Sequence, residues 1–329
     1  MNRPVLYELL AMGRRYGSEY KRGLSNHLPM GLIALSKMGA GNDRLAEYAH
    51  NYVPRLEEKE APNTHFSTNN WKARLGEHTA NSEYVNFFEA ELDRLGSQAL
   101  LARYLPVLMP GVAGGAFHSL IRLGYALDLG LDTEIVEALA GWAMAYLDLG
   151  VANSTHMELP QHSILGLSQN EFFKQYKVDA PNIYSRLARI AEQPEFASFG
   201  GLAAETSLDD IRKVALQIYL GSGGEFTALH LVTSVHAVRV VAAVVGEAAG
   251  DLFAPLWRGL GAAYISIKMP PLVDVIPTTE HQWDAIFENA CSSEDEHVIK
   301  FAYTCFEESV AYEDDRYRAL AAVKVGLRG

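Results

Sequence analysis

Imidazole side chains stand at several positions where the surrounding sequence is apolar or rich in glycine. Of the eleven histidines, four lie in such stretches (His27, His118, His230 and His236), and His297 shares a predicted helix with a lysine. A single core histidine is usually only hydrogen-bonded, so each position alone indicates little. Several neutral imidazoles together, however, are typical ligands of iron, copper, zinc or nickel. The residues therefore predict a metal ion bound in the interior of the protein.

The spacing of two of these histidines does not fit a regular helix. His230 and His236 are six residues apart, which places them roughly 120° apart around a helix of 3.6 residues per turn. A regular helix would not direct both side chains at one ion. A π-bulge or a helix start near His230 would bring them together, and π-bulges favour functional sites.

Helical periodicity runs through the whole chain, and the alternation typical of strands is almost absent. Helices are predicted at 29–37, 43–52, 82–95, 98–105, 113–127, 133–148, 181–193, 207–220, 226–245, 251–267, 280–289 and 295–311. Longer loops are predicted at 57–70 and 151–169. The segment 226–245 is apolar around its full circumference, which is typical of a helix buried in the middle of a fold. The sequence therefore predicts an all-α protein, a single compact bundle over 1–329 with this helix at its centre.

Composition limits the partners and the compartment. The formal net charge of −12 argues against a nucleic-acid partner, because such binding depends on clustered lysine and arginine. Only two cysteines are present, Cys291 and Cys305, and two free thiols fit a reducing cytosol. The first helix lacks the features of a signal peptide, and arginine and histidine interrupt the most apolar stretch. We therefore expect a cytoplasmic protein without a membrane partner, and no oligomeric state is predicted.

Two other classes of protein fit parts of the same pattern. Glu-x-x-His pairs occur at Glu47/His50 and at Glu294/His297, which is the spacing found in ferritin-like di-iron oxidases. Alternatively, the chain is a non-catalytic helical protein whose histidines line a small-molecule pocket. Metal content separates these hypotheses, since they require one ion, two ions and none. A dinucleotide-binding site is not predicted, because the glycine clusters of the sequence lack the strand–turn–helix frame of its fingerprint.

Four segments together resemble the questin oxidase family. They are SNHLPM at 25–30, LMPGVAGGAFHSLIRLGYA at 108–126, HLVTSVHA at 230–237 and DEHVIK at 295–300. The glycine-rich segment around His118 is the most specific of them, and the likeness extends through nearly the whole chain. Fungal members of the family open the central ring of anthraquinones with dioxygen. The resemblance thus implies an oxygenase acting on an aromatic polyketide or anthraquinone-like substrate, and adds NADPH as a candidate cosubstrate.

The resemblance also implies a ligand set. A characterised relative is similar to non-haem iron dioxygenases and holds mononuclear iron with four histidines and a lysine carboxylated on its side-chain nitrogen. The matching positions here are His27, His118, His230, His236 and Lys300, with His297 as a rival for one histidine place. Helical periodicity alone would instead place Lys300 on a solvated flank of its helix.

Further roles follow from this implied site. Thr233 is expected to hydrogen-bond the modified lysine. Phe117, Tyr125 and Trp142 are candidate walls for a flat polycyclic substrate. No catalytic residue other than the ligands is predicted.

Overall fold

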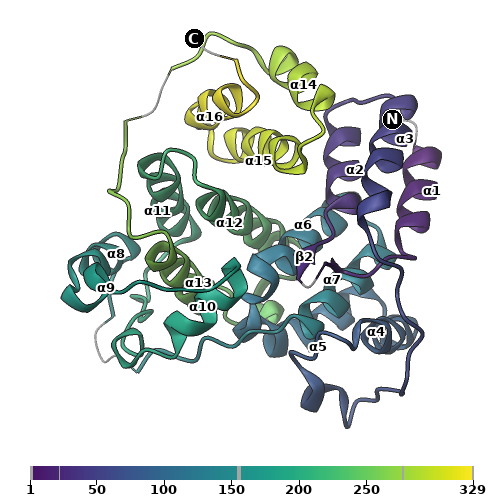
Figure 1. The fold of residues 1–329 in the computed structure, drawn as a ribbon, viewed down its shortest axis with the longest axis horizontal. Coiled ribbons are helices and arrows are strands. Elements are labelled where there is room, and N and C mark those ends of the chain that lie inside the picture. The colour runs from purple at the N-terminus through teal and green to yellow at the C-terminus, as the bar shows by residue number, and fades with distance from the viewer. Residues whose placement is uncertain (1–2, 22, 154–156, 276–277, 328–329) are drawn as a thin grey trace. The chain divides into compact units, whose positions relative to one another are not determined.

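The structure is a computed structural model that describes residues 3–21, 23–153, 157–275 and 278–327 (Figure 1). Helices account for nearly all regular structure in these residues. The only strands described there are β1 (Glu19–Tyr20) and β2 (Leu24–Ser25), which pair antiparallel. The predicted all-α class is confirmed. The chain groups into two compact units, a terminal unit (Met1–Ala61 with Val275–Gly329) and a central unit (Pro62–Asp274). The single domain predicted over 1–329 stays a prediction.

Each unit is a set of packed helices connected by loops and short 3-10 segments. The terminal unit contains α1 (Arg3–Gly13), α2 (Leu28–Lys37), α3 (Asn42–Tyr52), η1 (Val53–Arg55), α14 (Trp283–Ser292), α15 (Glu296–Tyr312) and α16 (Arg316–Lys324). The central unit contains η2 (Trp71–Arg74), α4 (Asn81–Leu95), α5 (Ser97–Leu108), η3 (Met109–Gly111), η4 (Gly114–Phe117), α6 (His118–Leu129), α7 (Asp132–Met144), α8 (Pro160–Gln169), α9 (Glu171–Gln175), α10 (Ile183–Ala191), η5 (Pro194–Phe196), α11 (Leu208–Gly221), α12 (Phe226–Val245), η6 (Gly246–Ala249) and α13 (Phe253–Ser266).

Helix α12 forms the core of the central unit, as its all-round apolar sequence predicts. It packs against α6, α11 and α13. Contact with α6 is close because Gly124 faces Ala237, where an added Cβ atom would lie 3.1 Å from the Ala237 backbone. By length and composition the segment Phe226–Ala249 could cross a membrane, but 72% of its apolar window is buried inside the protein.

The terminal unit is built around α2 and α15. Helix α2 packs against α1, α3 and α15, and α15 also contacts α14 and α16. Gly31 of α2 leaves room for the Tyr48 ring of α3, since a Cβ atom at Gly31 would overlap that ring. Because three helices of this unit cover α15, most of its circumference is buried.

One predicted loop is wrong in its second half. The segment 151–169 was expected to be irregular, but residues Pro160–Gln169 form α8. Proline at the first helical position is favourable, because its missing N–H would have no helical partner there. Pro160, Ser163, Ile164 and Leu167 form its buried face at helical spacing. The other predicted loop, 57–70, is irregular as expected.

Candidate metal centre

Two imidazole rings of the central unit meet edge to face. His118 is the first residue of α6 and His230 lies one turn into α12. Their Nε2 atoms are 3.2 Å apart, and their ring centroids are 4.7 Å apart. His230 is fully buried and His118 partly so. The structure thus joins two of the predicted ligands across 112 residues of sequence.

Backbone carbonyls fix the protonation pattern of this pair. The Nδ1 atom of His118 lies within hydrogen-bonding distance of the Gly115 carbonyl oxygen, and that of His230 lies 2.8 Å from the Phe226 carbonyl oxygen. A carbonyl only accepts, so both Nδ1 atoms carry the proton and donate it. Each neutral ring then presents its Nε2 lone pair to the other ring. Two lone pairs at this distance repel each other unless a cation or a shared proton lies between them.

The segment before His118 holds an unusual backbone conformation. Gly115, Ala116 and Phe117 all have positive φ, at 54°, 54° and 67°. For the two residues with a Cβ atom this conformation costs roughly 1–2 kcal/mol each. Gly114 is required for packing, since a Cβ atom there would lie 1.8 Å from the Ala145 carbonyl oxygen. Such strain concentrates at functional sites, and here it turns the chain so that the His118 ring reaches His230.

His236 is not brought to this pair. Helix α12, which the structure describes along its whole length, is regular and contains no π-bulge. The two histidines of this helix therefore point in different directions, as their spacing indicates. The Nδ1 atom of His236 lies 3.4 Å from an Arg239 terminal nitrogen.

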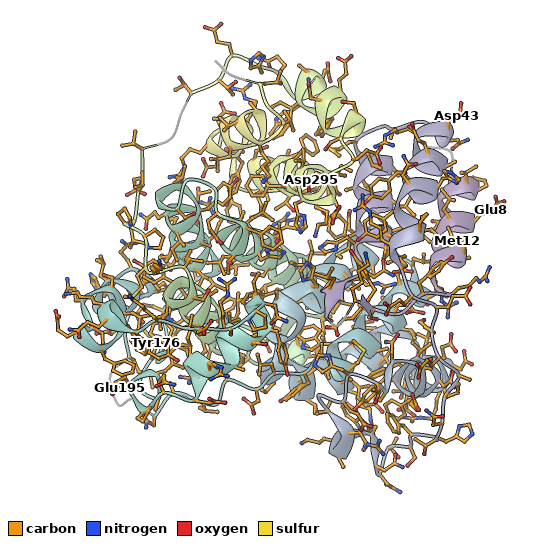
Figure 2. All side chains as sticks on the ribbon, viewed as in Figure 1. Glu8, Met12, Asp43, Tyr176, Glu195 and Asp295 are labelled. Atoms are coloured by element: carbon orange, nitrogen blue, oxygen red, sulfur yellow. The ribbon has the colours of Figure 1, made fainter. Side chains whose placement is uncertain are left out.

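A second imidazole pair lies in the terminal unit. His27 precedes α2 and His297 lies in the first turn of α15, with ring centroids 4.7 Å apart. The His27 Nδ1 atom is 2.6 Å from the Ser25 carbonyl oxygen, so it donates there and leaves Nε2 as the ligand atom. His297 Nδ1 faces Asp295 Oδ1 at 3.4 Å, and this contact lowers the pKa of Asp295 (labelled in Figure 2). Burial lowers the pKa of His297, which favours its neutral, ligating form.

Lys300 lies three residues after His297, on the same side of α15. Its side chain is 0% exposed, in contrast to the solvated flank that helical periodicity indicated. Periodicity within one helix does not include contacts with other helices, and α15 contacts α2, α14 and α16. Burial lowers the pKa of the Lys300 ammonium from 10.5 to about 7, although the negative charges of Glu296 and Asp295 oppose this shift. A large part of the Lys300 population is therefore a neutral amine near pH 7.

The residues predicted to hydrogen-bond the modified lysine or to contact the substrate are all buried. Thr233 donates its hydroxyl to the carbonyl oxygens of Leu229 and His230 on its own helix. Phe117, Tyr125 and Trp142 are all buried, with exposures of 0%, 3% and 1%. The substrate role of these three rings and the hydrogen bond from Thr233 to the modified lysine stay predictions.

Sequence reasoning missed an aromatic side chain beside His230. The Phe226 ring stands edge to face with the His230 ring, with centroids 4.8 Å apart, and is 50% exposed. Its carbonyl also accepts the His230 Nδ1 proton. The four-residue spacing of the two positions was the available signal, because it places both side chains on one face of a helix. Phe226 is therefore a better candidate for contact with a flat substrate than the three buried rings.

Comparison with known proteins agrees with the segments noted above. A family model described as questin oxidase-like matches residues 24–305. The "Baeyer-Villiger oxidase ptaJ" of Pestalotiopsis fici is 24% identical over 131 residues, which cover 36% of this chain and 29% of that protein. The match thus spans less than a third of the relative's length. Since the family model covers well over half of the sequence, the chain belongs to the questin oxidase-like family.

Proposed function

We propose that this protein is a non-haem iron oxygenase of the questin oxidase type. The observation that carries the proposal is the 3.2 Å separation of the His118 and His230 Nε2 atoms, in two rings whose Nδ1 atoms both face carbonyl oxygens. Two nitrogen ligands at roughly 2.0–2.1 Å from one ion, at an angle of about 90–109°, lie about 2.8–3.4 Å apart. A proton shared between the rings would leave a charged imidazolium in a buried position, which is unfavourable. A metal ion satisfies both lone pairs at once.

The proposed ligands are His118 and His230 from the central unit and His27 and His297 from the terminal unit. In each unit the Nδ1 atoms face carbonyl or carboxylate oxygens, the arrangement typical of metal-binding histidines. We choose His297 as the fourth histidine because its ring stands beside the ring of His27. Convergence of the two pairs on a single ion is part of the proposal and rests on the family resemblance.

Lys300, carboxylated on its side-chain nitrogen, is proposed as the anionic ligand. Carboxylation requires a neutral amine, and the lowered pKa of Lys300 supplies one near pH 7. A carbamate would place negative charge among neutral imidazoles and so offset part of the charge of the iron. An unmodified ammonium would be disfavoured beside a cation.

The proposed reaction is oxygenation, with ring opening, of an aromatic polyketide or anthraquinone-like substrate. Bound iron would supply the means to activate dioxygen or to bind a phenolate. The chain itself holds each ring in one tautomer through its Nδ1 bonds, and the Phe226 ring offers a face for a flat substrate. Family membership and the name of the Pestalotiopsis relative support an oxygenase, and NADPH remains a candidate cosubstrate. A cytoplasmic location stays a prediction.

The positions of two glutamates in the terminal unit argue against the di-iron alternative. Glu47 and Glu294 both lie at the surface, with side chains 63% and 47% exposed. Both pair with Arg44, at 3.2 Å and 2.8 Å. A ferritin-like site needs such glutamates to face inward, toward the metal.

Oxygen uptake with a hydroxyanthraquinone tests the proposed function. Iron-loaded protein should consume dioxygen in the presence of this substrate, and chelation of iron or the change His118→Ala should abolish the uptake. Labelled ¹⁸O₂, with and without NADPH, reports whether one or both oxygen atoms enter the product. Uptake that survives both iron removal and His118→Ala would contradict the proposal.

A further inference from the structure

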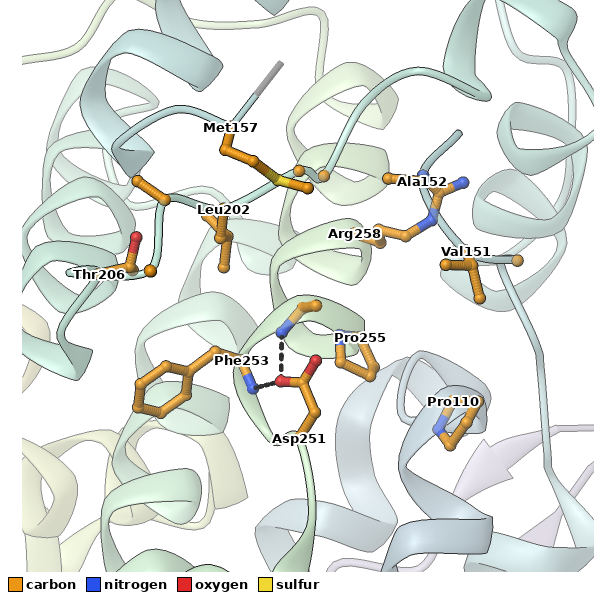
Figure 3. Close-up of a pocket in the computed structure, with 16 residues that line it drawn as sticks. Pro110, Val151, Ala152, Met157, Leu202, Thr206, Asp251, Phe253, Pro255 and Arg258 are labelled. Carbon is orange, nitrogen blue, oxygen red and sulfur yellow. Dashed lines mark hydrogen bonds between the residues drawn. The ribbon is translucent and has the colours of Figure 1, made fainter. Parts of the chain in front are cut away.

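A cavity of about 410 Å³ opens on the central unit, formed mainly by three stretches of chain together with Pro110 and Met157 (Figure 3). Residues 150–152 line one side, residues 200–204 with Thr206 line a second, and the start of α13 lines the third. Its size lies in the range of sites for small organic ligands. Most lining side chains are apolar, including Val151, Met157, Leu202 and Phe253.

Arg258 is the cationic residue in this lining, and it is only 4% exposed. Its Nε and Nη2 atoms donate to the Leu149 carbonyl oxygen at 3.3 Å and 2.8 Å, and Nη1 donates to the Phe199 carbonyl oxygen. A guanidinium group has five N–H bonds, so these contacts leave two donors for another partner.

The positive charge of Arg258 is not neutralised by a direct ion pair. In the described part of the chain, the hydrogen-bond partners of its guanidinium are backbone carbonyl oxygens and not carboxylates, although the charge of Asp148 acts on it. Burial accordingly lowers the pKa of Arg258. The Phe196 ring, with its centroid 4.7 Å from the guanidinium carbon, supplies only partial compensation. A buried cation of this kind favours an anionic partner.

The surrounding chain is shaped to hold Arg258 in place. Gly200 has a φ of +111°, and a Cβ atom there would lie 2.5 Å from the Arg258 Cγ atom. Asp251 caps α13, because its Oδ1 atom accepts from the backbone N–H groups of Phe253 and Ala254 at 3.0 Å and 3.1 Å. A carboxylate therefore already accepts from the first N–H groups of the helix, and Arg258 supplies the positive charge in the lining of the pocket.

We propose that this pocket binds a flat organic anion, an aromatic carboxylate. The rings would lie against Met157, Leu202 and Phe253, and the carboxylate would accept the two remaining N–H bonds of Arg258. Charge-assisted bonds of this type are strong and directional, and the apolar walls provide the remaining affinity. This site is a binding site in its own right and does not depend on the proposed metal centre.

Titration calorimetry with 2-naphthoate tests this proposal, with 2-naphthamide as the uncharged control ligand. The first variant is Arg258→Met, which removes the cation. Because it also leaves two buried carbonyls without their donor, it could impair folding, so Ala254→Leu serves as a second variant that fills the cavity from the first turn of α13. Ala243→Leu, at an exposed position of α12, is the matched control for an alanine-to-leucine change in a helix.

We expect 2-naphthoate to bind wild-type protein and Ala243→Leu equally. Its Kd should rise about tenfold or more in Arg258→Met and in Ala254→Leu, as expected for loss of one charge-assisted contact or of the space itself. 2-Naphthamide should bind at least tenfold more weakly than 2-naphthoate. His118→Ala should leave 2-naphthoate binding unchanged, which separates this site from the metal centre. Equal binding of both ligands, unchanged binding by Ala254→Leu, or loss of binding in His118→Ala would overturn the proposal.

Discussion

Replacement of Lys300 by methionine should change how the stability of the protein depends on pH. Methionine keeps most of the length of the side chain and removes its charge. The pKa of Lys300 is about 7 in the folded protein and 10.5 in the unfolded chain. Between these values the unfolded chain binds a proton that the folded protein does not bind. Stability therefore increases with pH across this interval, by up to about 1.4 kcal/mol per pH unit.

From pH 7 to pH 9 the two pKa values give a gain of roughly 2 kcal/mol in the free energy of unfolding of wild-type protein. Lys300→Met should lack this gain, and Lys72→Met, which changes an exposed lysine, should retain it. Urea denaturation of chelator-treated protein, followed by circular dichroism in carbonate-free buffer, measures the difference. If wild-type protein and Lys300→Met change in parallel from pH 7 to pH 9, the assignment of a low pKa to this buried amine is wrong.

Three further changes test the site and its supports. Ala116→Gly should stabilise the protein by about 0.5–1 kcal/mol in urea denaturation, because glycine adopts the positive φ of this position without strain; a loss of stability would show that the turn is unstrained. Arg122→Met should cost about 3 kcal/mol in the same assay, because it removes the cation that the buried Glu134 carboxylate contacts at 2.7 Å; a change below 1 kcal/mol would contradict this. Asp295→Asn should weaken metal binding about tenfold in a chelator competition, since it weakens the partner of His297 Nδ1; unchanged affinity would argue against His297 as a ligand.

The central helix was predictable from sequence because its signal is local. Apolar residues all around 226–245 leave only a buried position for a helix, and α12 has these same bounds. Helix α8 was hidden because its exposed face is polar and its buried face has only four residues. The helical periodicity was present there, but the composition of 151–169 resembled that of a loop.

The sequence predicted which histidines belong to the candidate site, but it did not predict which of them contact each other. Apolar surroundings identified His118 and His230, but their contact joins α6 to α12 and depends on the turn at 114–117. Lys300 is buried, and its helix α15 contacts α2, α14 and α16; periodicity within α15 cannot represent contacts with other helices. The aromatic residues chosen as substrate contacts were picked by type, whereas the exposure of Phe226 is a property of the folded chain.

Metal content of the histidine variants tests the central claim most directly. Protein purified without exposure to oxygen should contain about one iron per chain by mass spectrometry, as expected for a mononuclear site of imidazole ligands. His236→Ala and His281→Ala should retain this content. His118→Ala and His297→Ala, which each remove one member of an imidazole pair, should lose most of it while circular dichroism stays helical. Iron content that is the same in His118→Ala, His297→Ala and His281→Ala would contradict the assignment of these imidazoles as metal ligands.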